Sequence, residues 1–200
     1  MLPSYAAGLT YASKVESYTE GAGIKEAYRR NTSNALGNPN LDGKFFDNNK
    51  KFLSLGVGGQ AIFSFGTAFQ DSVTIWETTW GAKKNQNSYD EQVEVYVSDS
   101  LSGNWILAGL IKNIADNAYR SQAGATVTLQ QGATYNFLKL VDKSAAGSDR
   151  DGFDINGIAV KASATQPVPE PTTMSGLAVA AAGLVAARRR QAKQKAETNA

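Results

Sequence analysis

Apolar and polar positions alternate with a period of two over much of the chain, which is the pattern of β-strands with one buried face. The clearest case is residues 92–98, where three valines share one face and Glu94 and Tyr96 share the other. β-branched and aromatic residues dominate such segments, as half-buried pleated surfaces favour. The same alternation predicts strands at residues 61–65, 72–78, 105–107, 127–129 and 158–160, and it predicts that residues 137–141 form a strand buried on both sides for part of its length.

Turn signals separate these segments at short intervals. Gly66 follows the strand at 61–65, and Ser102-Gly103-Asn104 has the composition of a hairpin connection. Short helical turns are expected at 31–36 and 114–119. Seven or eight short strands with few helix starts predict an all-β fold, an antiparallel β-sandwich of jelly roll-like type, over residues 1–166.

The last part of the chain has a different composition. Residues 167–173 hold three of the five prolines, residues 174–187 carry no charge, and residues 188–200 are basic. We predict a linker, a transmembrane helix and a cytoplasmic tail, which would leave the β-sandwich outside the membrane. Fourteen helical residues span only about 21 Å, less than the roughly 30 Å hydrocarbon core, so a buried helix and a disordered alanine-rich tail stay open as alternatives.

The order of these parts resembles the PEP-CTERM sorting signal. Its three elements are Pro169-Glu170-Pro171, the apolar span, and the cluster Arg188-Arg189-Arg190 close to the end of the chain. The resemblance implies a bacterial exported protein whose partner is an exosortase that cuts at the Pro-Glu-Pro end. It also implies a place at the cell surface or in the extracellular matrix, with links to biofilm and extracellular polysaccharide.

The beginning of the sequence conflicts with export. A signal peptide has a basic start and an apolar core of 7–15 residues. Residues 1–8 have no basic residue and no apolar core. We therefore expect that the natural start lies upstream of Met1.

The β-rich part resembles galactose-binding-like and discoidin-like cell-surface jelly rolls. The resemblance rests on short motifs spread over most of residues 10–162, namely those at 35–40, 54–59, 73–77, 93–99, 140–142 and 151–155. It implies a domain that binds sugars, lipids or proteins or acts as a spacer, and that often carries a structural calcium ion.

Composition limits the chemistry that this chain can perform. It has no Cys and no His, which excludes disulfides, thiol catalysis, Cys-ligated zinc and every catalytic arrangement that needs histidine. The net charge of +2 comes from the tail: residues 188–200 hold five of the 20 basic residues and one of the 18 acidic ones. The remaining 15 basic and 17 acidic residues make residues 1–187 slightly acidic, so we predict no nucleic-acid partner.

The best candidate metal site is the loop at residues 147–154. Asp149, Asp151 and Asp154 place three carboxylates within six residues, and a hard cation such as calcium takes six to eight oxygen ligands. The alternative is an ordinary Asp/Gly turn in which the carboxylates cap backbone donors and Arg150 pairs locally.

A second candidate site is formed by Trp76, Glu77 and Trp80, because aromatic platforms fit the faces of sugar rings. Trp76 is predicted to face solvent, opposite Val73 and Ile75, whereas Trp105 is expected in the core. The alternatives are that Glu77 is a plain solvent-facing residue and that residues 80–89 form an ordinary connecting loop.

We therefore expect a non-enzymatic exported surface protein. One alternative is a carbohydrate-binding module with a structural calcium ion, whose partner would be an extracellular polysaccharide. A second is a glycan-active enzyme that uses carboxylates such as Glu77 and Asp151. A third is a tail-anchored cytosolic protein.

Overall fold

The computed structural model describes residues 8–39, 51–78, 90–113, 124–147 and 150–163. The chain divides into two compact units, residues 1–163 and 164–200, and all described residues belong to the first. The sorting signal, the expected membrane helix at 174–187 and the basic tail thus lie outside the described residues, as do Trp80, Asp149 and the turn expected at 114–119. No helix within the described ranges is long and apolar enough to cross a membrane.

The described part is built from antiparallel strands and two short 3-10 helices, η1 (Ala27–Arg30) and η2 (Thr32–Ala35). The strands are β1 (Leu9–Tyr11), β2 (Lys14–Thr19), β3 (Leu53–Ser54), β4 (Gln60–Glu77), β5 (Gln92–Ser98), β6 (Ile106–Lys112), β7 (Ala125–Thr128), β8 (Tyr135–Asp142) and β9 (Asp154–Ala162). The prediction of an antiparallel all-β fold is confirmed for these residues, and η2 confirms the turn expected at 31–36.

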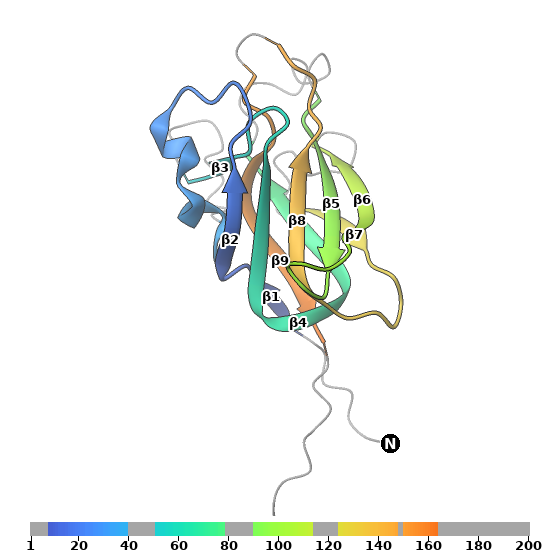
Figure 1. Ribbon diagram of the computed structural model, residues 1–200. Coiled ribbons are helices and arrows are strands. Elements are labelled where there is room, and N and C mark those ends of the chain that lie inside the picture. Colours follow the sequence, from blue (N-terminus) through green and yellow to red (C-terminus); the bar gives the residue numbers. More distant parts are fainter. Residues whose placement is uncertain (1–7, 40–50, 79–89, 114–123, 148–149, 164–200) are drawn as a thin grey trace, which may run out of the picture. The chain divides into compact units, whose positions relative to one another are not determined.

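Strand β4 belongs to two layers. Its first half pairs with β2 and β8, and β8 continues through β5 to β6. Its second half pairs with β7 and β9, and β9 also pairs with β1 and β3. Figure 1 shows β2, β4, β8 and β5 side by side, with β9 and the second half of β4 behind them.

The change of layer occurs where the pairing register of β4 shifts, between Ser64 and Phe69. Gly66 has a φ of 71° and Asp71 a φ of 66°, both in the left-handed region that turns the chain sharply. The sequence predicted two strands here, separated at Gly66. That boundary was wrong, because the segment forms one 18-residue strand that runs through the bend.

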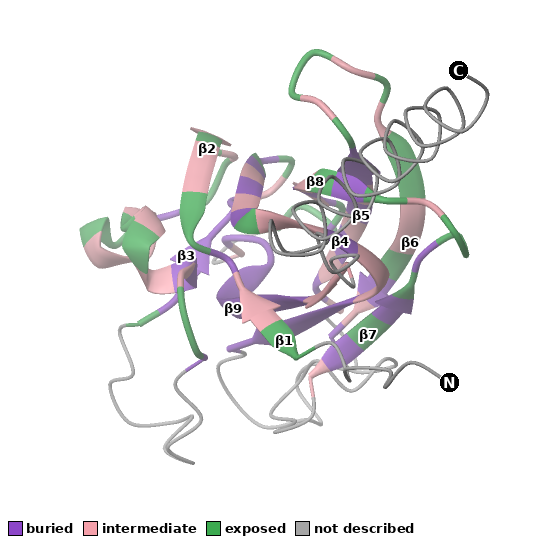
Figure 2. Ribbon diagram, turned by 90° about the horizontal axis from the view of Figure 1, so that it is seen from below, coloured by how far each residue is buried: buried purple, intermediate pink, exposed green. Residues whose placement is uncertain are grey.

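One apolar core lies between the layers. The inward positions of β5 are the three predicted valines, which are at most 1% exposed, and they pack with Phe63, Leu138 and Ile158. From Phe137 to Asp142 the side chains of β8 alternate between half-buried and buried, so the expectation that 137–141 is buried on both sides for part of its length was wrong. Figure 2 shows the buried segments along β4 and β9 and exposed segments on β6, where Leu107 is 54% exposed.

Gly152 lies where three parts of the backbone meet. Its φ is 77°, and a Cβ there would lie 2.7 Å from the carbonyl carbon of Gly56 and 2.9 Å from Oδ1 of Asp142. Gly132 has nearly the same φ, 78°, with nothing within 4 Å of the same position.

We expect Gly152→Ala to destabilise the domain by several kcal/mol and Gly132→Ala by only about 1 kcal/mol, as measured by urea unfolding. Both variants carry the cost of a left-handed alanine, and only Gly152→Ala adds a steric clash. Equal losses in the two variants would show that the close packing around Gly152 is not rigid.

Candidate functional site

Buried polar side chains gather at one end of the sandwich, where β4, β6 and β8 end and β5 and β9 begin. We call this region the polar end; its buried polar members are Glu77, Thr78, Glu91, Asn113, Asp142, Ser144, Asp151, Asp154 and Asn156. The end is assembled from four separate parts of the chain. Because the strands are antiparallel, these parts meet only in the folded state.

Asp142 is the best-satisfied carboxylate of the polar end. Its Oδ1 accepts hydrogen bonds from the Phe153 backbone N–H at 2.9 Å and from Ser144 Oγ at 2.7 Å. Its Oδ2 accepts from the N–H groups of Gly58 at 3.0 Å and Ser144 at 3.1 Å. These four donors come from the β3–β4 and β8–β9 connections, so Asp142 fixes both connections to the end of β8, which is a structural role.

Asp151 is held by Arg29, which lies 122 positions earlier in the chain. Arg29 Nη1 donates to Asp151 Oδ2, and the guanidinium lies 5.3 Å from the centre of the Phe52 ring. Burial by itself lowers the pKa of Arg29, but the hydroxyl of Tyr28 and the charge of Asp151 raise it above its usual value. Asp151 is thus engaged in an ion pair that comes from a distant part of the chain, whereas Arg150 donates to the carbonyl of Ala145.

Asp154 is a buried acidic side chain whose ionised form is disfavoured. It is 1% exposed, and its Oδ1 has no hydrogen-bond partner among the described residues. Burial raises the pKa of this carboxyl well above its usual value, and the charges of Asp151 and Glu91 raise it further. The nearby Ser54 hydroxyl and Arg29 act in the opposite direction and do not outweigh burial.

The polar end has oxygen atoms of the kind that bind calcium, but too few of the acidic side chains that the structure describes lie together to form a complete calcium site. Thr78 donates its backbone N–H to the Asp154 carbonyl at 3.0 Å, and its Oγ1, like Asp154 Oδ1, is buried without a hydrogen-bond partner in the described part of the chain. Such oxygens are the ligands that calcium takes. However, no group of three acidic, histidine or cysteine side chains suited to a metal occurs among the described residues.

The solvent exposure expected for Trp76 and Glu77 was wrong. Trp76 is 5% exposed, since the outer side of β4 is covered there by Tyr11, whose ring centre lies 6.3 Å from that of Trp76. Gly124 also lies against the indole. Glu77 is 1% exposed and belongs to the polar end, which also excludes the solvent-facing alternative.

The structure brings Glu77, Asp151 and Asp154 to the same end of the domain, although the sequence placed them in two separate sites. Sequence reasoning missed Arg29, Glu91 and Asp142. Asp142 and Glu91 flank strongly apolar strands, and a charged residue directly at a strand end is a signal that could have found them. Arg29 has no such signal, because its partner is fixed by tertiary folding alone.

Comparison with known families identifies one segment of the chain. Residues 167–190 match the PEP-CTERM protein-sorting motif. The chain therefore carries this sorting motif in the region where Pro169-Glu170-Pro171 and Arg188-Arg189-Arg190 stand. No curated protein matches the sequence.

Several solved structures are similar to the chain at low identity. A GH29 fucosidase from Ruminococcus gnavus, solved with fucose, is 22% identical over 60% of this chain, with a TM-score of 0.38; the match spans about a fifth (21%) of the fucosidase. The CBM32 of AlyQ, in complex with 4,5-unsaturated mannuronic acid, is 12% identical over 74% of this chain and 96% of its own, with a TM-score of 0.46. The C-terminal domain of a chitobiase from Bacteroides fragilis is 16% identical over 76% and 95%, with a TM-score of 0.44.

The raised pKa of Asp154 predicts that stability depends on pH. Without a bound cation, the protonated carboxyl is favoured in the folded state, so the free energy of unfolding falls as pH rises from the ordinary value of 3.8 up through the raised folded-state pKa. Each unit of pKa shift corresponds to about 1.4 kcal/mol. Urea unfolding in EGTA from pH 3.5 upward measures this loss.

The matched variant is Asp154→Asn, which has nearly the same shape and does not titrate. We expect it to lose less stability than the wild type over this pH range and to equal or exceed it at neutral pH. A wild-type curve with the opposite slope, not altered in Asp154→Asn, would contradict the prediction.

Proposed function

We propose that this chain is an exported bacterial protein of the cell surface or extracellular matrix, whose β-sandwich acts without catalysis. The observation that carries the proposal is the sorting motif at residues 167–190. In this proposal an exosortase is the processing partner, and residues 174–187 hold the precursor in the membrane until it is cut. The basic cluster that follows stays on the cytoplasmic side.

The C-terminal end of the described domain lies beside the bend of β4. Strand β9 ends at Ala162, beside the bend of β4, and Ser163 donates its N–H to the Ala68 carbonyl at 3.0 Å. The chain thus leaves the domain at the end opposite the polar end (Figure 1).

Sorting is tested by changing the motif in a bacterium that has an exosortase. We expect the triple change of Pro169, Glu170 and Pro171 to alanine to abolish processing and leave a full-length, membrane-bound precursor. Changing Lys193 and Lys195 to glutamine is the control and leaves processing intact. Mass spectrometry of the C-terminus of the surface-exposed protein measures the result, and an unchanged mature end in the triple variant would contradict the proposal.

As a molecular role we propose a jelly-roll carbohydrate-binding module. A structural calcium ion at the polar end is part of this proposal: the buried Asp154 Oδ1 without a hydrogen-bond donor favours it, and backbone carbonyls and water would have to supply most of the remaining ligands. Calcium would there compensate the charge of Asp154, whose ionisation is otherwise opposed by burial and by the charges of Asp151 and Glu91. Glu77 and Asp151 do not support catalysis, since the first is buried and the second is paired with Arg29.

Calcium is tested by thermal unfolding at neutral pH. An ion that binds only the folded state adds about 2.7 kcal/mol at a concentration 100 times its Kd, which raises the Tm of a domain of this size by several degrees. We expect this rise in the wild type and not in Asp154→Asn. Asp71→Asn is the control, because Asp71 is half-exposed and pairs with Lys161. An identical wild-type Tm in calcium and in EGTA would remove the ion from the proposal.

A further inference from the structure

The outer face of the β2–β4–β8–β5–β6 layer carries an arrangement that the polar end does not explain. On β8 the outward side chains are Phe137, Lys139 and Val141, all half-buried. In the register of the sheet Lys139 lies between Tyr96 of β5 and Ile62 of β4. Leu107 of β6 lies on the far side of Tyr96 and extends this face to the sheet edge.

The ammonium of Lys139 lies between two aromatic rings. Its Nζ is 4.9 Å from the centre of the Tyr96 ring and 4.6 Å from the centre of the Trp105 ring. The expectation that Trp105 belongs to the core was therefore wrong: its indole is half-buried, against a lysine of the outer face. The Tyr96 hydroxyl donates to Glu94 Oε2 at 2.7 Å, which fixes the ring over the lysine.

Lys139 contacts two aromatic rings and has no carboxylate partner among the described residues, in contrast to three other lysines. Lys14 pairs with Glu16, Lys143 with Glu94 and Lys161 with Asp71. Burial lowers the pKa of Lys139. A bound anion would remove this penalty at Lys139, and the nearby Glu94 of the same face is already engaged by Tyr96 and Lys143.

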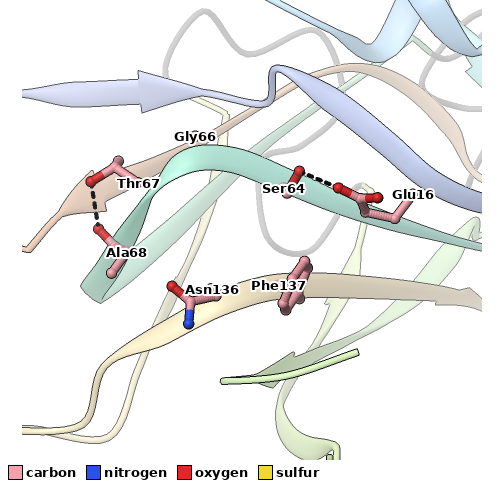
Figure 3. Close-up of a pocket in the computed structure, with 7 residues that line it drawn as sticks. All are labelled: Glu16, Ser64, Gly66, Thr67, Ala68, Asn136 and Phe137. Carbon is pink, nitrogen blue, oxygen red and sulfur yellow. Dashed lines mark hydrogen bonds between the residues drawn. The ribbon is translucent and has the colours of Figure 1, made fainter. Parts of the chain in front are cut away.

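A pocket of about 450 Å³ opens on the same layer, beside the bend of β4. Figure 3 shows Asn136 and Phe137 of β8 facing the bend, with Glu16 and Ser64 on the neighbouring strands. Phe137 and Lys139 are two residues apart on one face of β8, a spacing of about 6.7 Å. The pocket and the lysine therefore belong to one continuous surface.

The pocket is built to accept hydroxyl groups and to repel dense negative charge. Glu16 Oε1 accepts from Ser64 Oγ at 2.7 Å, and its Oε2 pairs with Lys14. These contacts lower the pKa of Glu16, so the carboxylate is ionised at neutral pH and keeps lone pairs for further donors. A ligand that carries both hydroxyls and separated carboxylates matches the pocket and Lys139 together.

We propose that the surface formed by Tyr96, Trp105, Phe137, Lys139 and this pocket binds a polysaccharide that contains uronic acid residues. A sugar carboxylate pairs with the Lys139 ammonium, and hydroxyls of a neighbouring sugar donate to Glu16 and contact Asn136. Trp105 and Phe137 supply apolar surface for the sugar rings. This inference deepens the proposed function, on which it rests, by naming the ligand class and a site on the sheet face.

The test is isothermal titration of the full 200-residue chain with polygalacturonate and with the neutral methyl ester of the same polymer. We expect binding of the acid form that weakens with added salt, and about tenfold weaker binding by Lys139→Gln. Lys139→Arg keeps the charge and retains binding within a few-fold. Lys161→Gln, which removes a half-exposed lysine from the other layer, serves as the matched control and binds like the wild type.

Other outcomes overturn the inference. These are no binding of the acid form by the wild type, equal binding of the acid and its ester, and unchanged affinity in Lys139→Gln. Equal binding of single-stranded DNA would also overturn it, since that result indicates a general polyanion surface. Binding of the neutral ester that is insensitive to Lys139→Gln leaves the carbohydrate-binding role standing without this site, so the two failures are distinguishable.

Discussion

The bend of β4 is the constraint on which the rest of the described domain depends. Strand β4 pairs with strands of both layers. The position of its bend therefore fixes how the two layers face each other. Aromatic side chains fill the inside of the bend: the Phe65 and Phe69 ring centres are 5.1 Å apart, and Tyr135 lies 6.0 Å from Phe69. The same bend forms the wall of the surface pocket and places the polar end at the opposite end of the sandwich.

The polar end buries three carboxylates in three different ways within one small region. Asp142 accepts four hydrogen bonds and holds the neighbouring connections in place, whereas Asp151 forms an ion pair with Arg29. Asp154 has burial and like charges around it, which disfavour its ionised form. The charge of such a buried carboxylate can be neutralised by a proton or balanced by a bound cation. Under the proposed function, the stability of the domain therefore depends on both pH and calcium through this one side chain.

The outer sheet face presents the reverse situation, in which a cation is held without a carboxylate. Two ring faces stabilise the Lys139 ammonium while leaving it able to meet an anion. A charged side chain that is already ordered loses less entropy when it binds. The domain thus combines a buried acidic end, which bears on its stability, with an outer face suited to a ligand.

The sequence by itself determined the local features of this protein. Period-two alternation gave the valine strand β5 with its correct bounds and its correct buried face, because side-chain direction in a strand depends only on neighbouring positions. The order of Pro-Glu-Pro, apolar span and arginines gave the sorting motif, because such a motif is read as a linear segment.

Tertiary structure decided what covers each strand and which distant residues meet. Trp76 is buried because Tyr11 lies over it, and Trp105 lies outside because Lys139 supports it there. Alternation shows that two faces differ, but it cannot tell whether the second face meets solvent or another part of the chain. Tertiary contacts also explain why β4 runs on past Gly66 and why Arg29 pairs with Asp151. Both features depend on contacts that form only after the layers come together.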